Sequence, residues 1–164
     1  MPRLDPEEAL SGPLYVVAII LVAIPAIDFL LSVPAMNFGS VQWRFAAVGL
    51  LSGYTLTPVL GISLGLVIAS VLKQHRVQLA LVILCLTMGA LLLVMCVAFL
   101  FDALQLRSAI PVDGRVAFNS AWRRAILKHA LSGVALLYLG WMARRMIPPR
   151  TSKRGPKPVH VVSK

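Results

Sequence analysis

Acidic residues, histidines and cysteines are scarce in this chain of 164 residues, which has six Asp and Glu, three His and two Cys. It has no Walker-type glycine loop, no H-E-x-x-H zinc motif, no C-x-x-C pair and no nucleophile elbow. Cys85 and Cys96 lie in one apolar block, and their separation on a helix is about 16 Å, too far for a disulfide. We therefore expect neither an enzyme nor a metal site.

Charged residues are also sparse. They make up 13% of the chain, whereas a soluble domain has about a quarter. Hydrophobic residues make up 59%, and they come in blocks as long as the about 20 residues that a bilayer crossing needs. This composition predicts an integral membrane protein.

Four apolar blocks, at about 14–34, 45–72, 77–104 and 120–146, predict an all-α, four-helix transmembrane bundle with antiparallel neighbours. Together they form a membrane domain at 14–147. Pro58 predicts a kink in the second span. Residues 105–119 are expected to form a loop, with Asn119 or Ser120 capping the fourth helix.

The two ends differ from the membrane domain. Residues 1–13 are expected to form a polar head with a short interfacial helix, broken from the first span at Ser11-Gly12-Pro13. Residues 148–164 carry Pro, Gly and basic residues but almost no large apolar groups. We expect them to form a disordered basic tail.

The formal charge of +10 is concentrated at one end, because seven of the sixteen basic residues lie at or beyond Arg144. This pattern is typical of a cytoplasmic flank beside anionic lipid, and we expect no nucleic-acid partner. With four spans, the side of the two termini carries ten basic residues and the other side six. The positive-inside rule then predicts cytoplasmic N and C termini, in a membrane of the bacterial inner type.

Seven basic residues are candidates for docking to lipid headgroups or a partner: Arg123, Arg124, Arg144, Arg145, Arg150, Lys153 and Arg154. Arg123 and Arg124 open the expected fourth helix, where positive charge opposes the helix dipole. This mismatch indicates an anionic partner, either lipid phosphate or the acids Asp102 and Asp113.

Small residues recur at every fourth position of the second span: Gly49, Gly53, Thr57, Gly61 and Gly65, continued by Ala69. This extended GxxxG pattern forms a groove in which another helix backbone can approach closely. Two interpretations stay open. The groove packs inside the chain, or it contacts a partner subunit.

Asp28 is the acid placed well inside a span, and a lone carboxylate in hydrocarbon costs several kcal/mol. Lys128 and His129 enter the membrane to a similar depth from the same side. We expect a polar contact between Asp28 and one of these two residues, which would join the first helix to the fourth. The alternative is a proton-coupling acid, because Asp28 resembles the single acid in the first helix of small four-helix multidrug exporters. This chain differs from them in its greater length and basic tail.

Ala125 and His129 form an A-x-x-x-H step that resembles the bacteriochlorophyll-binding step of light-harvesting antenna helices. The resemblance covers two residues, and Lys128 departs from it. It would imply a pigment or haem at His129, but we expect no cofactor and a hydrogen-bonded histidine instead.

The function that these features favour is non-catalytic. We expect an accessory or structural subunit that packs against a larger membrane complex of the respiratory or photosynthetic type. Its expected partners are membrane lipids and, through the second helix, membrane proteins. The alternative is a small proton-coupled transporter that uses Asp28.

Overall fold

The computed structural model describes residues 6–33 and 37–147, with side chains from Leu10 onward. These residues are helical and include no strand, which confirms the all-α prediction. The elements in chain order are α1 (Pro6–Ser32), α2 (Val41–Tyr54), α3 (Leu56–Val71), α4 (His75–Arg107), a 3₁₀ turn (Val112–Gly114) and α5 (Arg115–Met146). The expected tail at 148–164 lies outside the described residues.

Three stretches are long and apolar enough to cross a membrane: Leu10–Ser32, His75–Arg107 and Val112–Met146. The bent pair of α2 and α3 makes a fourth if it counts as one span. Helices of this length and hydropathy indicate insertion into a membrane.

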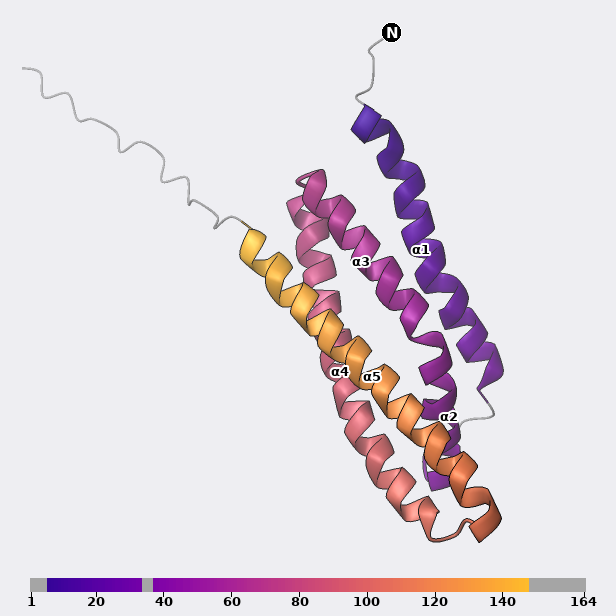
Figure 1. Ribbon diagram of the computed structural model, residues 1–164. Helices are drawn as coiled ribbons and strands as arrows, with labels where there is room; N and C mark the ends of the chain where they lie inside the picture. Colours follow the sequence, from indigo (N-terminus) through magenta and orange to yellow (C-terminus); the bar gives the residue numbers. More distant parts are fainter. Residues whose placement is uncertain (1–5, 34–36, 148–164) are drawn as a thin grey trace, which may run out of the picture.

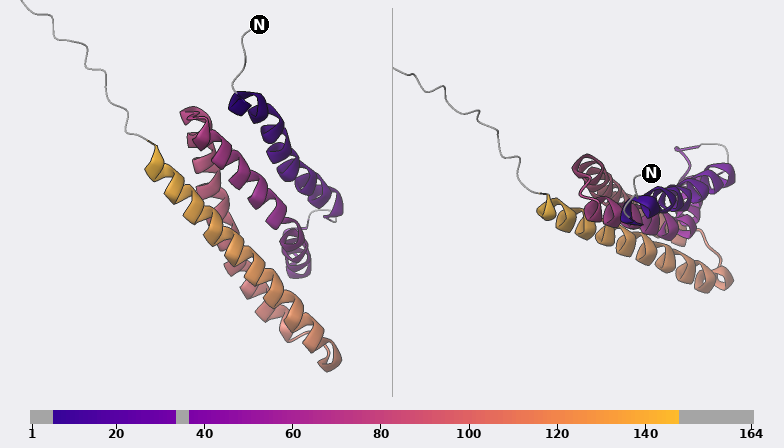
Figure 2. Two further views of the ribbon diagram at one scale, coloured as in Figure 1. Left: turned by 45° about the horizontal axis from the view of Figure 1, so that its top comes forward. Right: turned by 90° about the horizontal axis from the view of Figure 1, so that it is seen from above.

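The helices run as antiparallel neighbours. The start of α1, the turn between α3 and α4 and the end of α5 lie at one end of the molecule, and α2 begins at the other (Figure 1). α1 packs against α3, while α4 packs against α5. In the described chain no Cα atom of α1 lies within 8 Å of one in α4 or α5. Figure 2 shows α1 against the α2–α3 rod, on the side away from α5.

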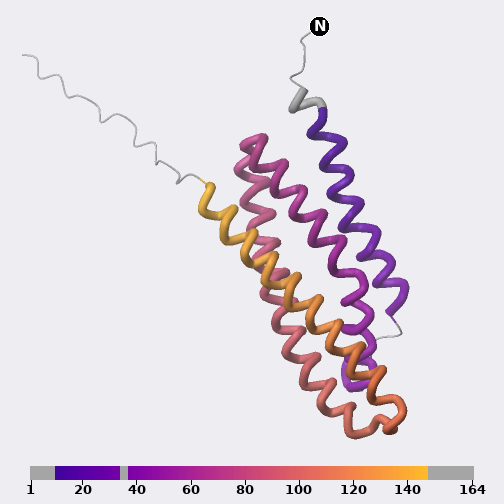
Figure 3. The backbone as a smooth tube through the Cα atoms, viewed as in Figure 1, coloured from indigo at the N-terminus to yellow at the C-terminus, as the bar shows by residue number. Residues whose placement is uncertain are grey.

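The second span is bent at Thr55, where α2 and α3 meet at 47° (Figure 3). Pro58 explains the position of the bend. Proline has no N–H to bond the carbonyl four residues earlier, and its ring clashes with that carbonyl. The affected carbonyl is that of Tyr54, at the end of α2. The predicted kink is therefore present, one turn before the proline that causes it.

Two predicted boundaries are wrong. α1 continues through Ser11, Gly12 and Pro13 without a break, because a proline removes a single hydrogen bond and the rest of the helix keeps its own. The expected loop at 105–119 is mostly helical, since α4 extends to Arg107 and α5 begins at Arg115. Asn119 and Ser120 do not cap α5. They lie within its first two turns, where the Ser120 hydroxyl donates to the carbonyl of Ala117.

The α4–α5 contact is closely packed at three glycines. A Cβ atom added to Gly89 would lie 2.9 Å from the backbone oxygen of Gly133 and 3.1 Å from the backbone nitrogen of Leu137. One added to Gly140 would lie 3.1 Å from Cβ of Cys85. Small residues allow helix backbones to approach this closely, and such packing joins helices where no hydrophobic drive exists.

Gly89→Ala should destabilise the protein by about 1–3 kcal/mol, because the added methyl group meets backbone atoms that cannot move aside. The matched control is Gly53→Ala on α2, where an added Cβ has nothing within 4 Å. This control should leave stability unchanged or raise it by about 1 kcal/mol through helix propensity. Thermal unfolding in mild detergent measures both. Equal stability of the two variants would contradict the described packing of α4 on α5.

Candidate functional site

A partly buried ion pair connects α2 to α4 near one end of the molecule. Arg44 donates from Nε to Oδ2 of Asp102 at 3.1 Å and from Nη2 to Oδ1 at 2.8 Å. A third donor, Nη1, binds the carbonyl of Phe38 at 2.9 Å. The Asp102 side chain is 9% exposed and that of Arg44 is 37% exposed. This bidentate geometry is the strong form of an arginine–carboxylate contact.

A stack of three aromatic rings lies beside this ion pair and connects α2 to α4 and α5. Phe45, which follows Arg44, stacks on Phe99 of α4 with ring centroids 4.7 Å apart and on Phe118 of α5 at 5.1 Å. Phe99 lies one helical turn before Asp102 and is almost completely buried. The stack therefore fixes α2 between α4 and α5 at the level where the ion pair forms.

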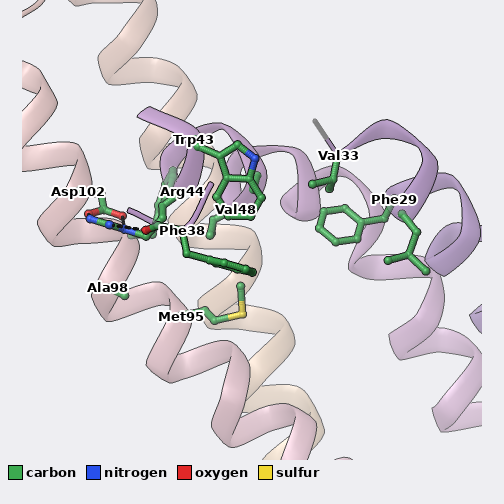
Figure 4. A pocket seen from close by; sticks show the side chains of 12 residues that line it. Phe29, Val33, Phe38, Trp43, Arg44, Val48, Met95, Ala98 and Asp102 are labelled. Carbon is green, nitrogen blue, oxygen red and sulfur yellow. Dashed lines mark hydrogen bonds and ion pairs between the residues drawn. The ribbon is translucent and has the colours of Figure 1, made fainter. Parts of the chain in front are cut away.

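The ion pair lies at one end of a cavity of about 510 Å³ between α1 and α4. Figure 4 shows Phe29 of α1 and Val33, which follows this helix, on one side of this space and Arg44 with Asp102 on the other. A second cavity of about 430 Å³ shares Phe29, Leu30 and Met95 with the first and has an almost wholly apolar lining. The two cavities are consecutive parts of one groove.

His129 is completely buried in α5. Its Nδ1 lies 2.8 Å from the carbonyl oxygen of Ala125. A carbonyl can only accept, so Nδ1 carries the proton. The other nitrogen, Nε2, is buried without a partner in the described chain. Because Ala125 is also buried, a macrocycle at this step would require α5 to separate from its neighbours. A pigment or haem at His129 thus stays an untested hypothesis.

The described residues include no group of three or more His, Cys, Asp or Glu able to hold a metal ion.

The predicted contact between Asp28 and Lys128 or His129 is wrong. Asp28 and Lys128 are both exposed, and neither has an ion pair or hydrogen bond within the described residues. The reason is the arrangement of the helices, since α1 packs on the α2–α3 rod and does not approach α5. Asp28 lies about one turn from the end of α1, on a face that no other helix covers.

The predicted docking residues are spread over both ends of α5. Arg123 and Arg124 are exposed, and Arg123 lies 5.8 Å from the ring centre of Trp122. Arg144 and Arg145 are exposed at the opposite end, and the Arg145 guanidinium lies over Trp141 at 3.7 Å. Asp102, proposed as a partner of Arg123 or Arg124, is instead paired with Arg44. Three further candidates, Arg150, Lys153 and Arg154, lie outside the described residues.

The glycine stripe of the second span divides at the bend. A Cβ atom on Gly61 would lie 2.7 Å from the carbonyl oxygen of Ala18, so this glycine admits the backbone of α1. Gly65 is buried in the same region, and Thr57 is half-buried. Gly49 and Gly53 have nothing within 4 Å of an added Cβ. The α3 half of the stripe packs inside the chain, and the α2 half is open.

Sequence reasoning missed the Arg44–Asp102 pair, although a signal for it was present. Asp102 is an acid in the third apolar block, a few residues before its end, and Arg44 is the basic residue at the start of the second. In an antiparallel pair of spans these two positions lie at the same end.

Comparison with protein-family models, curated proteins and solved structures found no match for this chain.

Asp102→Asn should lower the thermal unfolding midpoint in mild detergent by about 2–5 °C, because it removes the carboxylate that accepts two hydrogen bonds from the partly exposed guanidinium of Arg44. Asp28→Asn is the matched control and should leave the midpoint unchanged, since Asp28 is exposed and has no partner in the described chain. If both variants unfold at the same temperature, the ion pair does not contribute to stability.

Proposed function

We propose that the chain crosses the membrane four times and acts as a non-catalytic accessory subunit of a larger membrane assembly. The bent α2–α3 pair serves as one span, and both termini lie on the cytoplasmic side. The greater number of basic residues at the end that holds Lys73, Arg76 and Arg144 supports this orientation.

The observation that carries the proposal is the open face of α2 at Gly49 and Gly53. Glycine inside a helix costs about 1 kcal/mol relative to alanine. Gly61, Gly89 and Gly133 each admit a neighbouring helix, so their close contacts offset that cost. Gly49 and Gly53 make no such contact within the part of the chain that the structure describes. A partner helix approaching this face would supply one.

The transporter alternative has less support. A proton-coupling acid acts from a polar path through the bundle. Asp28 instead lies exposed on α1, and the lining of the groove beside α1 is apolar apart from the Arg44–Asp102 end. No feature of the described residues favours transport over association.

The experiment is purification from the native membrane in mild detergent, followed by mass spectrometry and an absorption spectrum. Wild-type chain should co-purify with other membrane subunits in fixed stoichiometry. The double variant Gly49→Leu/Gly53→Leu should lose them, because leucine side chains hold a partner backbone away. Its own thermal stability should not fall, since the face is open.

The control is Ala135→Leu, which places a leucine side chain at an exposed position of α5. It should retain the co-purifying subunits. Purification of the wild-type chain alone would count against the accessory role. Equal retention by both variants would place the contact on another face of the molecule.

A further inference from the structure

The groove between α1 and α4 extends over most of the length of α1. A third cavity, of about 400 Å³, shares Val22, Ile62 and Leu84 with the second. The combined lining begins at Tyr15 of α1 and reaches Val33, which directly follows the end of the helix at Ser32. Eighteen residues of helix correspond to about 27 Å, close to the about 30 Å thickness of a bilayer's hydrocarbon core.

The groove is open along its side because its two walls do not meet. α1 and α4 have no Cα atoms within 8 Å of each other, and the α2–α3 rod forms the floor. The walls are aliphatic and aromatic along almost the whole length. A small polar substrate would find few hydrogen-bond partners there, whereas a long hydrocarbon chain would match the lining.

One end of the groove is polar and carries unused hydrogen-bond donors. A guanidinium has five N–H donors, and Arg44 uses three of them on Asp102 and Phe38. Arg44 therefore retains two N–H groups at a side chain that is 37% exposed and lines the cavity. Trp43 lines the same end, and its amphipathic ring is typical of headgroup level. Arg107, Arg115 and Arg124 add positive charge at this end of the bundle.

We propose that this groove is a binding site for an anionic phospholipid. The phosphate accepts hydrogen bonds from the two remaining N–H groups of Arg44, and an acyl chain lies along the groove between α1 and α4. Asp102 holds the guanidinium in place from the other side. The free donors of Arg44, the further arginines at this end and the length of the groove match this ligand, and the proposal does not depend on the accessory role.

Native mass spectrometry of the full chain tests the proposal. The protein is reconstituted in vesicles of phosphatidylcholine with a minor share of phosphatidylglycerol and then released in mild detergent. Phosphatidylglycerol should be retained, enriched about fivefold over its share of the mixture. Its phosphate charge is not offset by the ammonium group that phosphatidylcholine carries, and one basic residue near anionic lipid supplies a preference of about this size. Arg44→Gln should abolish the enrichment.

Two further variants separate this result from misfolding and from general surface charge. Ala98→Trp fills the groove at an exposed lining position and should reduce the amount of retained lipid while leaving the Arg44–Asp102 pair intact. Arg107→Gln removes an exposed charge at the same end, outside the described groove lining, and should leave the enrichment unchanged.

Three outcomes would overturn the proposal. The first is retention of phosphatidylcholine and phosphatidylglycerol in the proportions of the mixture. The second is equal retention by wild type and Ala98→Trp, which would place the lipid outside the groove. The third concerns protein purified directly from its native membrane. There, a phosphate-free lipid such as a quinone, or a partner helix, would be found in the groove.

Discussion

Hydrocarbon offers no hydrogen-bond partner, so every polar group in these helices depends on a partner within the chain or in a molecule beside it. The hydroxyls of Ser63, Ser70 and Thr87 donate to carbonyls of their own helices, one turn earlier. Arg44 and Asp102 neutralise each other across two helices. Among the described side chains, Nε2 of His129 is the buried polar atom that remains without a partner. The positions of the polar groups follow from this constraint.

The same solvent removes the hydrophobic drive between helices and leaves close packing to join them. At Gly89, Gly133 and Gly140 the backbones of α4 and α5 approach until an added methyl group would collide. Gly61 brings α1 equally close to α3. Between α1 and α4 no such contact exists, and the space remains open as a groove. Close contacts at glycines thus occur in the two most extensive helix pairs, α4 with α5 and α1 with α3.

Hydropathy predicted the helical segments well, because the length of an apolar block is a local property of the chain. Pro58 likewise predicted the bend, although its effect falls on the carbonyl of Tyr54. The pairing of charges was not predictable in the same way. Asp28 and Lys128 were expected at similar depths in the membrane, but depth does not show which face a side chain occupies or which helices are neighbours. The groove depends on α1 and α4 not being neighbours, a tertiary fact that no single segment encodes.

The two proposed contacts use different sides of α2. Arg44, Ala47, Val48 and Leu51 line the groove, whereas Gly49 and Gly53 face open space. At 100° per residue these two sets lie on roughly opposite sides of the helix. The bend at Thr55 lets α2 take its own direction, separate from that of α3. A lipid in the groove and a helix at the glycine face would therefore not compete for space. Because the aromatic stack fixes the rotation of α2 about its axis, both surfaces depend on Phe45, Phe99 and Phe118 holding that helix in place.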